Sequence, residues 1–210
     1  MRLVLLTKPK YQAMLAAITE IHAPKTPYAF AFDRAGLAKA LTAGAETRLI
    51  GFATDVIVTQ AQLEALGGNA YNLHPGPPER PGWAPSVHAI MEGDPRFGVT
   101  FHRMAPRVDA GPIVTALRFP MPEGASLSFL DLLAEKSAFK LLLHLGPRIA
   151  EPGPLPETDM AWTGRRTTRR DIDALYEEAP SMAGERAARW ERARIGLDRA
   201  LAGLAGKPDR

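Results

Sequence analysis

The chain has 210 residues, of which 46% are hydrophobic and 23% are charged, and its formal net charge is only +3. This length suits one globular domain with an appendage and allows a sizeable buried core. Cysteine is absent, which excludes disulfide bonds, a zinc site built on thiolates and a cysteine nucleophile. No apolar run approaches the ~20 residues that span a bilayer, and residues 1–7 predict a buried strand rather than a signal peptide. We therefore expect a cytoplasmic protein without a membrane partner.

Strands and helices are predicted to alternate up to His74. Short apolar runs rich in branched residues indicate strands, and apolar positions at three-four spacing indicate helices. In chain order these elements are a strand over 2–7, a helix over 10–22, a strand over 28–32, a helix over 34–42, two apolar stretches within 48–58, a short helix over 60–66 and a strand over 70–74. Their alternation predicts an α/β fold, a Rossmann-like, mostly parallel sheet flanked by helices.

The pattern changes after His74. Residues 75–82 are rich in proline and glycine, so they suit neither a helix nor the interior of a sheet and are predicted to form a shaped loop. The elements predicted beyond this loop are a helix over 85–91, strands over 98–104 and 113–119, and a long amphipathic helix over 127–145. Proline-rich residues 151–156 mark a boundary. We therefore expect a main domain over 1–157 and a basic, helical C-terminal extension over 158–210.

The extension carries an apolar stripe and a basic cluster. The stripe recurs near a three-four spacing, which predicts a helix over 181–204, and it consists of Ala187, Trp190, Leu197, Leu201 and Leu204. We expect the stripe to pack on its own domain, with a homodimer through this helix as the alternative. The basic cluster comprises Arg165, Arg166, Arg169 and Arg170. Such a cluster binds phosphate or nucleic acid in some proteins, but a solvated surface or linker is the role expected here.

The candidate chemistry lies at the end of the strand over 70–74. In open α/β sheets, ligands bind at the carboxyl ends of the strands. Asn72 and His74 are two residues apart in a strand, so their side chains project to the same side. The loop before residue 113 carries Asp109 back towards them if the strand ends lie close. A lone histidine or a turn-forming aspartate is usually structural, but the three together in this context favour a reaction centre.

These groups suit the transfer of an acyl group to an amine. The Asn72 amide and a protonated His74 can donate hydrogen bonds to the oxygen that gains negative charge. The Asp109 carboxylate can raise the pKa of His74 and help to remove the amine proton, directly or through water. Asparagine does not titrate, so Asn72 must bind or orient. This chemistry needs neither a metal nor a covalent intermediate.

Three motifs surround these residues: Asn-x-His-Pro at Asn72–Pro75, Gly-x-Thr-x-His at Gly98–His102 and Asp-x-Gly-x-Ile at Asp109–Ile113. With them, the stretch from about Arg48 to Arg148 resembles the catalytic domain of formyltetrahydrofolate-dependent formyltransferases. That family includes glycinamide ribonucleotide transformylase, methionyl-tRNA formyltransferase, nucleotide-sugar N-formyltransferases and formyltetrahydrofolate hydrolase. The resemblance implies the formyltransferase fold for residues 1–157, and it implies catalytic roles for Asn72, His74 and Asp109.

The resemblance also implies a formyl donor, 10-formyltetrahydrofolate, and a pocket that holds it. The residues that it assigns to this pocket are Asp55, Val56, Val58, Met104 and Val108. His102 occupies a strand position at which some relatives carry a histidine that does not react. We therefore expect a structural or supporting role for His102.

Features outside the three catalytic residues indicate the class of acceptor. The loop over 74–82 is similar to that of sugar-amine formyltransferases rather than to the serine- and leucine-rich loop of the purine and tRNA enzymes. Trp162 and the basic residues after it resemble a segment that follows the catalytic domain in the sugar branch. Residues 81–86, in contrast, are similar to an Arg-Gly-x-x-Pro stretch of the tRNA enzymes.

Two departures from the family bear on the substrate. The chain before Asn72 is shorter than in typical relatives by roughly one strand–helix unit of about 30 residues, so the N-terminal half of the domain is truncated. Thr7–Lys10 replaces the glycine-rich loop that holds phosphate in the purine enzyme, which disfavours a ribonucleotide acceptor. The residues after Thr158 have a helical pattern, unlike the β-barrel domain of the tRNA enzymes, so tRNA is disfavoured as a partner.

We therefore expect an N-formyltransferase that moves the formyl group from 10-formyltetrahydrofolate to a primary amine of a small acceptor. A nucleotide-linked amino sugar is the favoured acceptor. The alternatives that the sequence leaves open are a formyltetrahydrofolate hydrolase, an enzyme like methionyl-tRNA formyltransferase, and a non-catalytic module that binds folate or RNA. The shortened N-terminal half also leaves open that a partner chain helps to bind the carrier, or that the one-carbon donor is different.

Overall fold

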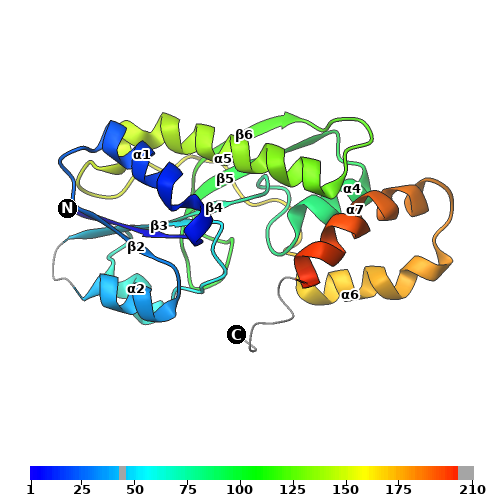
Figure 1. Cartoon of the computed structure of the whole chain (residues 1–210), viewed down its shortest axis with the longest axis horizontal. Helices are drawn as coiled ribbons and strands as arrows, with labels where there is room; N and C mark the ends of the chain where they lie inside the picture. Colours follow the sequence, from blue (N-terminus) through cyan, green and yellow to red (C-terminus); the bar gives the residue numbers. More distant parts are fainter. Residues whose placement is uncertain (43–45, 203–210) are drawn as a thin grey trace.

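The computed structural model describes residues 1–42 and 46–202, and its centre is a six-stranded sheet (Figure 1). The strands are β1 (Arg2–Leu6), β2 (Tyr28–Ala31), β3 (Thr47–Phe52), β4 (Ala70–His74), β5 (Arg96–Arg103) and β6 (Ile113–Pro120). They lie in the order β2-β1-β3-β4-β5-β6. The first four strands are parallel, whereas β5 pairs antiparallel with both β4 and β6. The sheet is therefore mostly parallel, and the predicted α/β class is confirmed.

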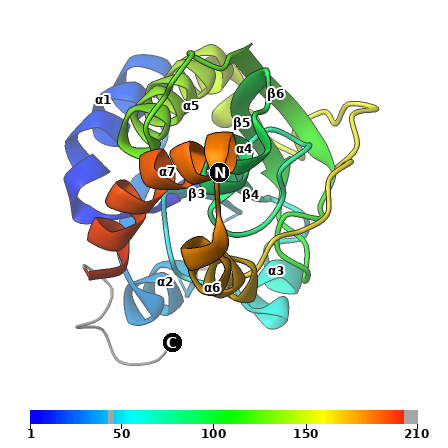
Figure 2. The ribbon, with the colours of Figure 1, turned by 90° about the vertical axis from the view of Figure 1, so that its right-hand side faces the viewer.

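Helices cover both faces of this sheet. They are α1 (Gln12–His22), α2 (Arg34–Leu41), α3 (Gln60–Ala65), α4 (Pro85–Glu92), α5 (Leu127–Ile149), α6 (Arg169–Glu178) and α7 (Gly184–Ala202), with single 3-10 turns at Pro9–Tyr11 and Ala179–Ser181. Helices α1 and α5 lie on one face, and α2 lies on the other (Figures 1 and 2). Alternate side chains of β1 enter the two layers: Leu3 and Leu5 pack with α1 and α5, and Leu6 packs with α2. Because both faces of β1 are buried, its sequence is continuously apolar from Leu3 to Leu6.

The strands and helices predicted up to residue 145 are present, with shifted boundaries. The second apolar stretch within 48–58, Val56–Val58, lies in the loop between β3 and α3 rather than in a strand. Helix α5 continues past the predicted end at residue 145 and contains Pro147. Helix α6 is not predicted from the sequence. Only Ile172 and Leu175 of this helix are buried, so it lacks a clear apolar pattern. A capping box between Thr168 and the residue three positions later fixes its start instead.

The residues after 157 pack on the rest of the chain. Helix α7 lies against α4 and α5, and its buried residues Trp190, Ala193 and Leu197 belong to the same apolar core as the sheet. Trp190, Leu197 and Leu201 of the stripe therefore pack on the chain's own core, as expected, whereas Ala187 is half-buried and Leu204 lies outside the described residues. Because the stripe is buried within one chain, it does not supply the surface for the alternative homodimer. No helix in the described ranges is long and apolar enough to cross a membrane.

Candidate active site

Asn72 and His102 face each other across the neighbouring strands β4 and β5. The antiparallel register pairs Asn72 with His102 and His74 with Thr100, and Asn72 Nδ2 lies 3.4 Å from His102 Nε2. Gly51 of β3 is the partner of Asn72 on the other side. A Cβ atom at Gly51 would lie 2.8 Å from Asn72 Oδ1, so the missing side chain at Gly51 makes room for the asparagine.

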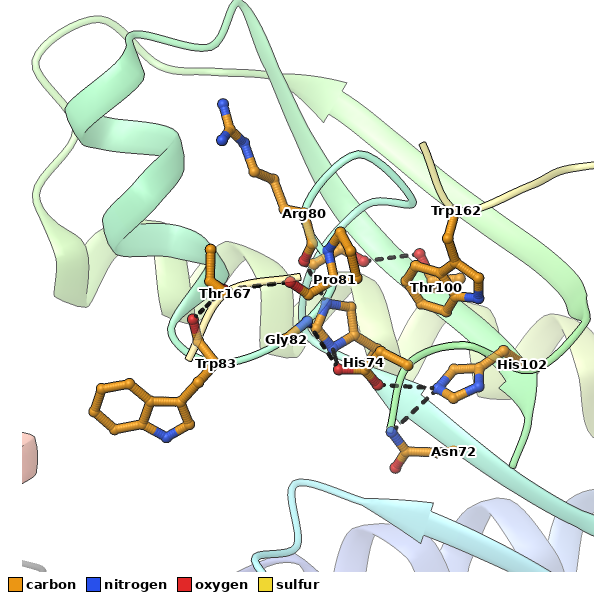
Figure 3. Close-up of polar contacts among 12 residues, drawn as sticks. Asn72, His74, Arg80, Pro81, Gly82, Trp83, Thr100, His102, Trp162 and Thr167 are labelled. Carbon is orange, nitrogen blue, oxygen red and sulfur yellow. Dashed lines mark hydrogen bonds and ion pairs between the residues drawn. The ribbon is translucent and has the colours of Figure 1, made fainter. Parts of the chain in front are cut away.

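His74 is buried at the carboxyl end of β4, with only 3% of its surface exposed. Its Nε2 lies 2.8 Å from the carbonyl oxygen of Arg80. A carbonyl oxygen can only accept a hydrogen bond, so Nε2 carries the hydrogen and donates it. The other ring nitrogen, Nδ1, lies 3.3 Å from Asp109 Oδ2. Both nitrogens of His74 are therefore engaged by the protein itself (Figure 3).

Asp109 is buried in the loop between β5 and β6, where its carboxylate lies between two imidazoles. Its backbone is left-handed, with φ 49°, a conformation that aspartate and asparagine tolerate better than most residues. Oδ2 accepts a hydrogen bond from the Gly82 amide at 3.0 Å, and Oδ1 lies 3.4 Å from His102 Nε2. Burial raises the pKa of Asp109, but the contacts with His102, His74 and Gly82 lower it by more, so the pKa lies below its ordinary value. The carboxylate is therefore ionised at neutral pH.

The two histidines carry their hydrogens on the sides away from Asp109. His102 Nδ1 lies 2.9 Å from the Arg103 carbonyl oxygen and donates to it, which leaves Nε2 free to accept from the Asn72 amide. In their neutral forms, both rings therefore carry no hydrogen on the nitrogen that faces the carboxylate; once a ring takes up a proton, that nitrogen donates to Asp109, and this is the contact that lowers the pKa of the carboxyl. Burial lowers the pKa of His74, and the Asp109 charge opposes this shift without cancelling it. The resting pair is thus ready to accept one proton between His74 Nδ1 and Asp109 Oδ2.

The loop over 75–82 is held from two sides. Thr100 of β5 donates a hydrogen bond from Oγ1 to the Gly76 carbonyl at 2.8 Å, which gives the threonine of the Gly-x-Thr-x-His motif a structural role. On the other side, Gly82 forms a parallel bridge with Thr167. A backbone hydrogen bond of 3.0 Å from the Thr167 amide to the residue before Gly82 reinforces the bridge. A loop without regular structure is thereby fixed next to His74.

Residues 158–167, here called the strap, cross the site and bring Trp162 to the imidazoles. The centroid of the Trp162 ring lies 5.5 Å from that of His74 and 5.0 Å from that of His102, both in edge-to-face contact. The indole Nε1 donates a hydrogen bond of 2.8 Å to the Gly111 carbonyl, in the same turn as Asp109. Trp162 therefore packs on both histidines and on this turn, as Figure 3 shows for the two rings.

A pocket of about 560 Å³ opens beside these groups. Asn72, His102 and Asp109 form its polar end, and the loops over 54–58 and 104–108 supply mostly apolar walls. His74 does not line the pocket; it contacts Asp109 from behind. In this arrangement His74 presents no donor to a group in the pocket, so the predicted hydrogen bond from His74 to a developing oxyanion does not fit the geometry.

The structure brings most of the predicted pocket residues together. The members that line the pocket are Val56, Val58, Met104 and Val108. Asp55 does not line it, because its carboxylate turns to the end of β1 and forms an ion pair of 3.1 Å with Lys8. Asp55 is thus paired with Lys8, which belongs to the Thr7–Lys10 segment.

His102, for which the sequence indicates a structural or supporting role, lines the pocket and faces both Asn72 and Asp109. The contact of Trp162 with the two histidines is not predicted, since nothing in the sequence shows that the strap folds back over β4. The feature of the sequence that indicates the position of His102 is the two-residue period of β5, which places its side chain on the same face as that of Thr100.

The basic cluster lies at the start of α6 and not in the pocket. Arg165 forms an ion pair of 2.7 Å with Asp171, and the Arg169 guanidinium lies 6.0 Å from the ring centroid of Trp83. The cluster is therefore partly neutralised by its own helix. Within residues 1–42 and 46–202, no group of three or more His, Asp or Glu side chains is arranged to hold a metal ion.

Comparison with known proteins links this geometry to a family. No family model matches the sequence. Over 147 residues the chain is 29% identical to a methionyl-tRNA formyltransferase of Geobacillus thermodenitrificans, a match that covers 65% of this chain and 46% of the relative. The chain therefore spans less than half the length of this curated relative.

Solved structures share the fold at lower identity. A sugar N-formyltransferase from a Shewanella species superposes with a TM-score of 0.70 at 18% identity, covering 91% of this chain and 87% of the other. The formyltransferase PseJ from Anoxybacillus kamchatkensis gives 0.66 at 20% identity, covering 83% and 90%. These comparisons agree with the resemblance that the motifs indicate: the chain is similar in sequence to a methionyl-tRNA formyltransferase and shares the fold of solved formyltransferases.

Proposed function

We propose that this protein transfers a formyl group from 10-formyltetrahydrofolate to the primary amine of a small acceptor. The observation that carries the proposal is the polar end of the pocket, where Asn72, His102 and Asp109 converge between apolar walls, with His74 against Asp109. The PseJ structure supports it, because that protein was solved with tetrahydrofolate and a formamido sugar nucleotide. The formyl donor supplies the carbon that is transferred, and the protein supplies orientation and proton transfer.

The pocket suits the flat ring system of a folate. Its walls are apolar with a few polar groups at one end, the composition that is typical of small-molecule sites. Ile57 and Val108, at the tips of the two wall loops, are 54% and 40% exposed. A ring bound between them would remove this apolar surface from water, which favours binding.

The proposed mechanism depends on which ring nitrogens of His74 and His102 carry hydrogens in the resting site. Asn72 Nδ2 donates a hydrogen bond to the formyl oxygen as negative charge builds on it. The attacking amine must lose a proton, and the Asp109 carboxylate accepts it while His74 Nδ1, 3.3 Å away, shares it as an ion pair. His102 accepts from the Asn72 amide and so holds its orientation. The same pair returns the proton to the nitrogen of the carrier when the bond to the formyl carbon breaks.

As the acceptor we propose an amino sugar linked to a nucleotide. The loop over 74–82 and the strap with Trp162 are similar in sequence to those of sugar-amine enzymes, and the PseJ structure contains such a product. The described residues after 158 form α6 and α7 and pack on α4 and α5, with no strand among them beyond the bridge at Thr167. This helical arrangement gives no support to a tRNA-binding β-barrel.

The test is turnover of 10-formyltetrahydrofolate followed by absorbance, with and without a panel of nucleotide-linked amino sugars, amino acids and methionyl-tRNA. Release of tetrahydrofolate that depends on an amino sugar supports the proposal. Release that depends on methionyl-tRNA moves the assignment to the tRNA branch, and release without any amine identifies a hydrolase. No release with any acceptor argues against transfer from this donor.

The oligomeric state stays a prediction. A homodimer through α7 would have to use the outer face of that helix, where Ile195 is 52% exposed, because the inner face is buried in the core. Light scattering of the purified protein measures the state directly. A monomer at micromolar concentration contradicts the dimer.

A further inference from the structure

The hydrogen bond between His74 and Arg80 decides which nitrogen of His74 faces Asp109. Nε2 donates to the Arg80 carbonyl at 2.8 Å, so Nδ1 is left without a hydrogen in the neutral ring. If Nδ1 carried the hydrogen instead, it would already be bonded to the carboxylate, and a further proton would have to enter at Nε2, which faces the Arg80 carbonyl and not Asp109. The position of one backbone carbonyl therefore decides which nitrogen of His74 takes up the proton.

The side chain of Arg80 anchors this carbonyl. Its Nε donates to Asp94 Oδ2 at 2.7 Å, and its Nη2 donates to Asp94 Oδ1 at 2.5 Å. A second carboxylate, that of Glu92, lies 2.6 Å from Nη2. Burial lowers the pKa of Arg80, but these two carboxylates raise it by more, so the guanidinium is charged at every relevant pH. A planar guanidinium bound by two carboxylates is a rigid attachment. Here it connects the loop to the end of α4.

The contact between His74 and Arg80 is also enclosed. A Cβ atom on Gly76 would lie 2.6 Å from His74 Nε2 and 3.0 Å from the Arg80 carbonyl oxygen. The absence of a side chain at Gly76 therefore lets the loop backbone lie directly against this contact. Backbone hydrogen bonds hold the loop on either side of this carbonyl, one of 2.9 Å from the Arg80 amide to Pro77 and one of 3.0 Å from the Thr167 amide to Pro81, so the Arg80 side chain is the anchor of Arg80 itself.

We propose that Arg80 is a positioning residue for the reaction: its clamped guanidinium holds its own carbonyl against His74 Nε2 and thereby keeps Nδ1 open towards Asp109. This inference rests on the proposed function and adds a residue whose side chain does not line the pocket. Arg80 acts through His74 and touches neither donor nor acceptor. Loss of the clamp lets the carbonyl move, and the imidazole can then exchange between its two neutral forms.

The test compares Arg80→Met with a matched control, Arg118→Met. Arg118 pairs with Glu79, the neighbour of Arg80 in the same loop, at 2.7 Å, but no backbone group of Glu79 contacts His74. We expect Arg80→Met to lower kcat by about 10- to 100-fold, the cost of misplacing a catalytic group by about 1 Å, with the KM for 10-formyltetrahydrofolate within about twofold of wild type. Arg118→Met should leave both constants near wild type, and Arg80→Lys should recover part of kcat because it keeps one charged contact.

The second readout is the ¹⁵N NMR spectrum of the His74 ring, which distinguishes the two neutral forms without any turnover. In wild type we expect one form, with hydrogen on Nε2; in Arg80→Met and in Asp94→Asn we expect a mixture. A single unchanged form in both variants overturns the inference, even if their Tm values fall. Inactive wild-type protein with the expected spectra would reject the proposed function and still support Arg80 as the residue that fixes His74.

Discussion

Replacing Asp109 by asparagine removes the proposed proton acceptor while keeping its shape. The amide oxygen can still accept the hydrogen bond that Oδ2 receives from Gly82 at 3.0 Å. Asparagine also tolerates the left-handed backbone, φ 49°, of this position. We therefore expect Asp109→Asn to fold, and its Tm to stay close to that of wild type.

The expected loss follows from the contacts that the amide cannot replace. The carboxylate lies 3.3 Å from His74 Nδ1 and 3.4 Å from His102 Nε2, and it is ionised at neutral pH because its pKa lies below the ordinary value. An amide neither takes up the proton of the amine nor stabilises a protonated His74. General-base catalysis contributes about 10²–10⁴-fold, so kcat should fall by that factor, or by about 3–5 kcal/mol of transition-state stabilisation.

The assay is steady-state turnover of 10-formyltetrahydrofolate with a saturating amine. The KM for the donor should stay near wild type, because the apolar walls of the pocket are unchanged. Asp198→Asn is the matched control, since Asp198 is a carboxylate on α7 that pairs with Arg194 at 3.0 Å, outside the pocket. A kcat of Asp109→Asn within about threefold of wild type refutes the proposed mechanism. Adding His74→Ala to it should cost little more if the two residues act as one unit.

Three further predictions follow from the packing. Gly51→Ala should lower kcat by about tenfold or more, because its Cβ would lie 2.8 Å from Asn72 Oδ1, and turnover assays would show it. Arg48→Met should reduce the free energy of unfolding in urea by about 3 kcal/mol, since Arg48 is fully buried and its guanidinium hydrogen-bonds carbonyls at the end of α5. Burial lowers the pKa of His74 and His88 below the ordinary histidine value, so the unfolded chain binds these protons first. Stability should then fall as the pH drops below about 6.5, and His88→Gln should flatten that slope in Tm measurements.

Much of the fold is predictable because local rules agree with the tertiary structure. Strand β1 is buried on both faces and appears as a continuous apolar run, and the helix that follows it, α1, buries Leu15 and Ile18 at three-residue spacing. Helix α6 escapes prediction because its start depends on a capping box and only two of its residues are buried. The apolar residues Val56–Val58 do not form a strand, since they serve as a wall of the pocket. Apolar character alone does not separate a strand from a ligand-facing loop.

The site is predictable in its residue types but not in the role of each nitrogen and oxygen. The motif gives Asn72, His74 and Asp109, and strand periodicity places the first two on one side. It does not reveal that the Arg80 carbonyl, six positions after His74, occupies Nε2, which turns His74 from a donor towards the pocket into a partner of Asp109. Nor does it reveal that the antiparallel register sets His102 opposite Asn72. The positions of the hydrogens depend on backbone carbonyls, which any residue can supply. The folded loop, and not the residue types, therefore decides which of these side chains donates and which accepts. For this reason the variants that matter most for the mechanism include Arg80, whose side chain lies outside the pocket.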